Sequence, residues 1–395
     1  MKKLLMATAA SALVAGSVHA EDVKLGILLG FTGPLESITP DMAAAVNLAI
    51  GEVNDSGVFL DGASTVSSIN ADTGCVDASL AVASAERLIT SDKVNGIVGG
   101  MCSGETTASL QNVALPNGMV MISPSATSPG LTAIEDNGLF FRTSPSDARQ
   151  GQVMADILND RGIKEVAVTY TNNDYGKGLA DSFQSAFEQS GGTVTINAAH
   201  EDGKADYSAE VGALASAGGE VLVVAGYVDQ GGAGIVNGSL DTGAFETFMF
   251  PDGMVSDALE QNFGDLVEGS FGQHPGNDSD GGAKFKAAGE AAGFAPTNAF
   301  APESYDAAAL ILLAMQAAGS TDPQVYKDKV MEVANAPGET ILPGELAKAL
   351  QILKDGGDVD FVGASAVELI EPGESAGNYR EIEFKDGAMT TVGYR

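Results

Sequence analysis

IVGGMCSGETTASLQNVALPNGMVMISPSATSPGLT, from Ile97 to Thr132, is the stretch that decides the fold. An apolar run ends in the small-residue turn MCSG, a helical segment follows, and a second apolar run ends in the turn PSATS. Two consecutive strands therefore bring Ser, Thr and backbone N–H groups to one edge of a sheet. In open α/β sheets small ligands bind at this edge, where helix N-termini also favour an anion such as a carboxylate. The stretch predicts a ligand site there.

The alternation of apolar strand and helix continues on both sides of this stretch. Strands are expected at residues 23–31, 64–70, 97–100, 119–123 and 139–143 in a first run, and at 165–170, 193–199, 220–225 and 247–250 in a second. Such alternation predicts parallel sheets that helices cover on both faces. We therefore expect two doubly wound α/β lobes.

The first twenty residues have the features of a secretory signal peptide. Lys2 and Lys3 precede an apolar stretch, and Val18-His19-Ala20 supplies a cleavage site. A membrane anchor is the alternative, but the apolar run is shorter than the ~20 residues that a span needs. We expect residues 1–20 to be removed and the mature protein to be exported and soluble.

The chain has two cysteines, Cys75 and Cys102, so one intrachain disulfide is possible. In an oxidising compartment a disulfide between them is favoured over two separate buried thiols. The formal net charge of −33 would repel nucleic acid and anionic lipid, so we expect neither as a partner. A hydrophobic content of 44% with regular apolar runs argues against a disordered acidic chain.

Gly100 to Gly104 matches G-x-C-x-G between a strand and a helix, the context of a nucleophile elbow. This is the basis of the alternative function, a secreted α/β-hydrolase with Cys102 as nucleophile. The triad would need a histidine, and beyond the leader the chain has His200 and His274. A disulfide-bonded sulfur is not a nucleophile, which weighs against this hypothesis.

Three turns of the second run carry polar side chains after strands, at Tyr175, Tyr227 and Asp252. Each alone fits an ordinary turn. Together they would set a carboxylate opposite the hydroxyl-rich turns of the first run, which suits an amino acid. The segment 278–282 resembles a calcium loop but lacks the distal Glu, so we expect no metal there, and no motif predicts a cofactor.

Together these residues resemble a substrate-binding protein of an ABC transporter, of the leucine/isoleucine/valine-binding type. The resemblance covers nearly all of the mature chain. It rests on Thr32-Gly33-Pro34, the pair Cys75 and Cys102 with Ser103 after it, Met121 to Thr132, Tyr175 to Gly178, Gly226-Tyr227 and Phe248 to Gly253. It implies a type I periplasmic binding fold, in which a three-crossing hinge joins two lobes that close around a ligand. Lobe 1 would contain residues 21–143 and 272–362, and lobe 2 residues 144–271 and 363–395. Leu35 to Thr39 replaces an aromatic residue often found after the first turn, so the resemblance does not fix which ligand side chain is recognised.

The resemblance also implies roles for individual residues. The ligand carboxylate would be bound by Ser103 and Thr127 with backbone around Ser125 and Ala126, the ammonium by Asp252 in place of the family's usual Glu, and the rest of the cleft would be lined by Tyr175, Tyr227 and Phe300 or Tyr305. It implies a periplasmic protein that binds an amino acid or a related carboxylate, contacts permease subunits transiently, and performs no chemistry. We expect a monomer. A receptor's sensing domain is a third hypothesis, disfavoured because no membrane span or signalling domain is evident.

Overall fold

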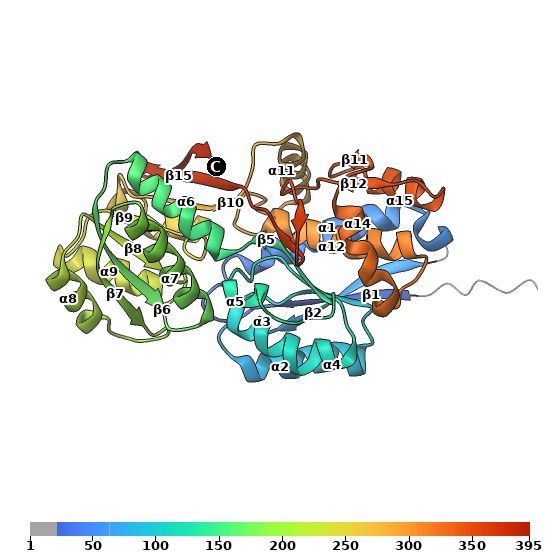
Figure 1. The fold of residues 1–395 in the computed structure, drawn as a ribbon, viewed down its shortest axis with the longest axis horizontal. Helices are drawn as coiled ribbons and strands as arrows, with labels where there is room; N and C mark the ends of the chain where they lie inside the picture. The colour runs from blue at the N-terminus through green and yellow to red at the C-terminus, as the bar shows by residue number, and fades with distance from the viewer. Residues whose placement is uncertain (1–21, 63) are drawn as a thin grey trace, which may run out of the picture.

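The computed structural model describes residues 22–62 and 64–395. It has two lobes side by side, each built on a seven-stranded sheet flanked by helices (Figure 1). The two doubly wound lobes predicted from the sequence are confirmed. The predicted leader at residues 1–20 lies outside the described residues. Within the described part, no helix combines the length and apolar character that a membrane crossing requires.

The sheet of the first lobe is parallel apart from one edge strand. In spatial order its strands are β13 (Leu369–Ile370), β14 (Glu374–Ser375), β5 (Phe140–Pro145), β4 (Met121–Ser123), β3 (Gly96–Gly99), β1 (Asp22–Leu29) and β2 (Thr65–Asp72). β13 runs antiparallel to β14. The side chains of β1 from Leu25 onward are almost all buried, as expected for a parallel strand covered on both faces.

The sheet of the second lobe ends in a hairpin. In spatial order its strands are β16 (Ala388–Tyr394), β15 (Tyr379–Lys385), β10 (Phe271–Pro275), β9 (Phe248–Phe250), β8 (Val221–Ala225), β6 (Glu165–Thr171) and β7 (Thr193–His200). β15 runs antiparallel to β10 and to β16. A separate parallel pair consists of β11 (Glu339–Ile341) and β12 (Val359–Phe361).

Helices cover both sheets. The first lobe has α1 (Thr39–Ser56), α2 (Ala78–Arg87), α3 (Ser103–Ser109), α4 (Leu115–Asn117), α5 (Pro129–Thr132), α11 (Asp280–Ala292), α12 (Ala301–Ala318), α13 (Pro323–Tyr326), α14 (Val330–Ala334) and α15 (Leu346–Lys354). The second has α6 (Asp147–Asp160), α7 (Asp174–Gln189), α8 (Ser208–Ala217), α9 (Gly231–Thr242) and α10 (Asp257–Phe263). Short π or 3₁₀ turns are η1 (Phe59–Gly62), η2 (Leu88–Asp92), η3 (Leu110–Ala114), η4 (Gly264–Val267) and η5 (Lys327–Lys329).

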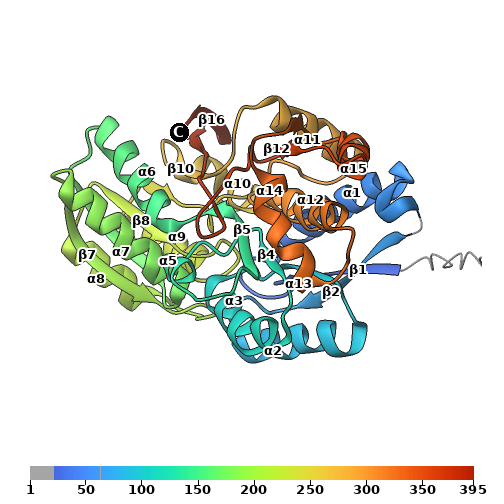
Figure 2. The ribbon, with the colours of Figure 1, turned by 45° about the vertical axis from the view of Figure 1, so that its right-hand side comes forward.

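The long apolar helix α12 is the centre of one face of the first lobe. Its side chains are buried on nearly every side from Ala301 to Gln316. It packs against α1, α14 and α15, which gather around it in the rotated view (Figure 2). A helix that is apolar all round must be covered on every side. Helices α14 and α15, near the C-terminus, supply part of that cover for α12.

The chain crosses between the lobes three times. β5 leads into α6, β10 leads into α11, and β14 is followed by β15 of the other sheet. The third crossing therefore follows Ser375. The segment 363–375, which we expected in the second lobe, contains β13 and β14 and pairs with the first sheet. The exact residue limits of the lobes stay a prediction.

Candidate functional site

A small cavity lies between the lobes. It is formed where turns follow the strands of both sheets. Its lining residues are Leu35, Met101, Cys102, Ser103, Ser125 and Phe300 from the first lobe, and Tyr175, Tyr227, Asp252 and Gly253 from the second. The strand ends of the two sheets therefore face each other across one site, as the rule for open α/β sheets predicts.

The two first-lobe turns are hydrogen-bonded to each other. The Ser125 hydroxyl donates to the Met101 carbonyl oxygen at 3.0 Å, and the Ser103 hydroxyl accepts from the Ser128 N–H at 3.1 Å. Glu105 on α3 stabilises the first of these turns, because its Oε1 accepts from the N–H groups of Met101 and Cys102. These bonds fix the Ser103 hydroxyl at the cavity wall, with its own proton free to donate to a ligand.

Asp252 is the charged residue of the second-lobe wall. Its Oδ1 accepts from the Tyr175 hydroxyl at 2.6 Å and from the Gly253 N–H at 2.8 Å. Tyr175 stacks on Tyr227 with ring centroids 5.2 Å apart, and Asn173 donates to the Tyr227 hydroxyl. Burial raises the pKa of Asp252, and the bond from Tyr175 offsets part of that rise.

Three of the predicted residues lie outside the lining. Ala126 and Thr127 are buried in the turn after β4. Tyr305 is also fully buried, and its hydroxyl donates to Oε1 of Glu52 on α1 at 2.9 Å. The structure therefore places Tyr305 inside the first lobe, and Phe300 at the cavity.

Two residues near the site escaped the sequence analysis, Asp147 and Gln150 on α6. Both are fully buried, and neither Asp147 oxygen nor either polar atom of Gln150 has a hydrogen-bond partner among the described residues. Burial raises the pKa of Asp147 well above its usual range, and repulsion from Asp252 adds to the rise. The sequence did hold one indication for Asp147, because this residue follows a predicted strand, as the predicted site residues do.

Contacts along the cleft hold the lobes together. The Ser37 N–H donates to Oδ2 of Asp229 at 2.9 Å, and the Asp229 N–H donates to the Pro34 carbonyl oxygen at 3.2 Å. Helices α5 and α7 also meet across the cleft, since a Cβ added to Gly178 would lie 2.9 Å from Cδ of Pro129. The structure is therefore a closed form of a two-lobed protein.

Cys75 and Cys102 form the predicted disulfide. The hydrolase hypothesis is not supported, because this bond removes the Cys102 thiol that would be the nucleophile. His200 and His274 are buried outside the cavity lining, and burial lowers the pKa of His200 to about 4 and that of His274 to about 3. Across residues 22–62 and 64–395, no three His, Cys, Asp or Glu side chains gather as a metal site would need.

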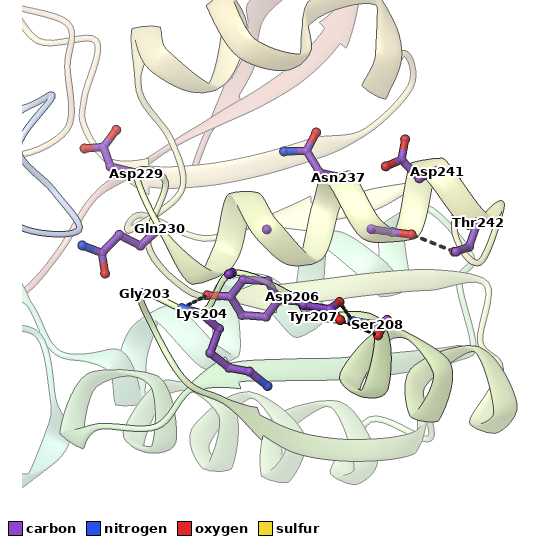
Figure 3. A pocket seen from close by; sticks show the side chains of 13 residues that line it. Gly203, Lys204, Asp206, Tyr207, Ser208, Asp229, Gln230, Asn237, Asp241 and Thr242 are labelled. Carbon is purple, nitrogen blue, oxygen red and sulfur yellow. Dashed lines mark hydrogen bonds between the residues drawn. The ribbon is translucent and has the colours of Figure 1, made fainter.

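A second, open hollow lies on the second lobe beside α9. Figure 3 shows Asn237, Asp241 and Thr242 projecting from this helix, with Tyr207 and Lys204 on the facing loop. None of the predicted ligand residues lines it. The interlobe cavity therefore remains the candidate site. Asp241 is exposed and lies outside that cavity, so its substitution can serve as a control for substitutions at Asp252 and Asp147.

Comparisons with known proteins agree with this geometry. The family model described as Periplasmic binding protein matches residues 22–339. The Leu/Ile/Val-binding protein homolog 1 of Brucella melitensis biotype 1 is 32% identical over 88% of this chain and 91% of its own.

Among solved structures, a leucine binding protein LivK of Thermotoga maritima has a TM-score of 0.79 at 22% identity, covering 94% of this chain and 98% of its own. A solute binding protein of an ABC transporter from R. palustris, solved with benzoate, has a TM-score of 0.76 at 19% identity, covering 95% and 96%. These two likenesses concern the fold. The family match, the identity to the Brucella relative and the closed interlobe site together lead to one conclusion: the chain belongs to the periplasmic binding protein family, as a substrate-binding protein.

Proposed function

We propose that the protein is the periplasmic substrate-binding component of an ABC transporter and that it binds a neutral amino acid, branched-chain or other, in the interlobe cleft. The observation that carries this proposal is the Asp252 carboxylate, which lines the same cavity as the Ser103 hydroxyl of the opposite lobe. An amino acid carries an ammonium and a carboxylate that complement these two walls. The names of the Brucella and Thermotoga proteins support the same ligand class.

The transport role follows from closure. A ligand that contacts both walls stabilises the closed form, and the closed surface is what a membrane permease would recognise. The proposal includes export through the leader at residues 1–20, a transient contact with the permease, and a monomeric state in the periplasm. Ser103, with backbone around Ser125, would hold the ligand carboxylate, and Leu35 and Phe300 would contact its side chain.

A ligand with a carboxylate and no amino group is the second candidate, because the R. palustris neighbour was solved with benzoate. Asp252 disfavours it, since an ionised carboxylate in the cavity would repel a purely anionic ligand. A thermal-shift screen of the twenty amino acids with benzoate and 4-hydroxybenzoate tests the choice. A ligand present at about 100 times its dissociation constant adds about 2.7 kcal/mol to stability, a shift of several degrees. Shifts with benzoates and none with amino acids would refute the amino-acid assignment.

A further inference from the structure

A cluster of buried polar groups lies at the point where α6, β9 and the turn after β4 meet. It consists of Thr127, Asp147, Gln150 and Asp252, each at most 1% exposed. Asp147 begins α6 directly after β5, and Gln150 follows on the next turn. We call Asp147 and Asp252 the carboxyl pair.

Six polar atoms of this cluster have no hydrogen-bond partner in the described part of the chain. They are both carboxylate oxygens of Asp147, Oδ2 of Asp252, both amide atoms of Gln150 and Oγ1 of Thr127. Buried polar groups in proteins are nearly always paired, and each one left unpaired costs about 1–3 kcal/mol. Such a concentration in one place indicates a site that receives a polar group.

These side chains also face one another. The Gln150 amide faces the Asp252 carboxyl and the Thr127 hydroxyl faces the Asp147 carboxyl, although neither contact has good hydrogen-bond geometry. Oδ1 of Asp252 is already occupied by Tyr175, so Oδ2 is the atom available to a ligand. The unpaired atoms are therefore mostly acceptors around a shared centre.

Arg142 on β5 is a fixed positive charge that acts on Asp147 and offsets part of the rise in its pKa. Its guanidinium bonds to Glu374 at 2.5 Å and to the carbonyl oxygens of Ala126 and Ser128, so its donors are engaged elsewhere. The other groups that face the pair are phenols, namely Tyr175 on α7, Tyr227 after β8 and Tyr379 on β15. The carboxyl pair thus has no cation of its own among the described residues that face it.

We propose that Asp147 and Asp252 together form the subsite for the primary ammonium of the ligand, with Gln150 as a third hydrogen-bonding partner, so that the cleft selects molecules that carry an amino group. An ammonium offers three N–H donors, which match Oδ2 of Asp252, an oxygen of Asp147 and Oε1 of Gln150. The inference rests on the proposed function and assigns Asp147 a direct part in it.

The proposal also predicts proton release on binding. Two buried carboxyl groups that repel each other retain a proton in the absence of a cation. When the ligand's ammonium enters, the retained proton leaves to solvent as the carboxyl group ionises. Affinity should therefore rise with pH over the range in which the pair ionises.

Calorimetry on the full mature chain tests this. L-leucine and 4-methylpentanoate, which lacks the amino group, are titrated at a series of pH values from 5 to 8, at each pH in two buffers of different ionisation enthalpy. We expect leucine to bind with net proton release and 4-methylpentanoate not to bind. Asp147→Asn, which keeps the size of the side chain, should weaken leucine binding about tenfold or more and reduce the proton release. The control Asp241→Asn, exposed on α9, should change neither quantity.

The outcomes separate the two proposals. Leucine binding without proton release, or with affinity unchanged by Asp147→Asn, overturns the ammonium subsite and leaves the amino-acid function standing. The wild-type buffer comparison decides this even if the variant does not fold. Binding of 4-methylpentanoate as tight as that of leucine overturns both proposals. Failure of leucine and every other neutral amino acid to bind also overturns both.

Discussion

Replacing Asp252 with Asn removes one charge from the cleft wall and little else. The asparagine Oδ1 can still accept from the Tyr175 hydroxyl and the Gly253 N–H, as the aspartate does at 2.6 and 2.8 Å. The new amide NH₂ takes the place of Oδ2, which has no partner within the described residues. The variant should therefore fold with near-native stability, because it also relieves the cost of burying a carboxylate.

The loss of affinity follows from the burial of this group. Asp252 is 1% exposed, so solvent does not screen its attraction for a ligand ammonium. Removing one partner of a buried charge pair costs about 2–5 kcal/mol. At 1.4 kcal/mol per tenfold, this corresponds to a loss on the order of 30-fold to 4,000-fold in affinity for the amino acid.

Isothermal titration calorimetry measures the change directly, with circular dichroism to check the fold and Asp241→Asn as the matched control. The control loses the same charge from an exposed position on α9 and should bind like the wild type. A folded Asp252→Asn variant that binds the amino acid within threefold of the wild type would refute the assignment of Asp252 to the ammonium.

Two further predictions concern stability. Replacing Cys75 and Cys102 by Ser opens a loop with a sequence separation of 27 residues, and in the chain-entropy model this should lower the free energy of unfolding by about 3–4 kcal/mol. Urea unfolding of the oxidised wild type and the variant checks this, and equal midpoints would contradict it. Burial raises the pKa of Glu105 from 4.5 to about 8, so the folded state binds more protons than the unfolded state between these values. Its contribution to stability is fully present below pH 4.5 and is lost as pH rises through about 8. In Glu105→Gln the unfolding free energy should therefore fall less between pH 5 and pH 8 than in the wild type, whereas an identical fall would exclude Glu105 as a cause.

The architecture was predictable because the strands and helices repeat over long, regular segments. The third crossing was not, because β13 and β14 are two residues each and Pro372 and Gly373 lie between them. Segments this short carry no measurable periodicity. The pairing of β14 with β5, and of β13 with β14, comes from tertiary packing that local sequence does not encode.

The lining of the interlobe cavity was predictable where a polar residue follows a strand, as at Ser103, Tyr175 and Asp252. Gln150 was not, because a polar residue inside an amphipathic helix is expected to face solvent, and its burial depends on what packs against α6. Tyr305 is the opposite case, a residue predicted at the site that the structure places outside the cavity lining. It lies five residues beyond Phe300 on α12, and a helix apolar all round gives no indication of which face meets the cavity.

The acidic surface cannot by itself explain discrimination between ligands. A net charge of −33 repels an anionic benzoate at long range, while a zwitterionic amino acid has no net charge to be repelled. At physiological ionic strength, however, that field decays over about 8 Å in solution. Inside the closed cleft the ligand is separated from solvent ions, so the charges that remain effective are the buried ones. Under the proposed function, selection for an amino group therefore falls to Asp252 and Asp147, which is why substitutions at these two positions, and not at Asp241, should change what the protein binds.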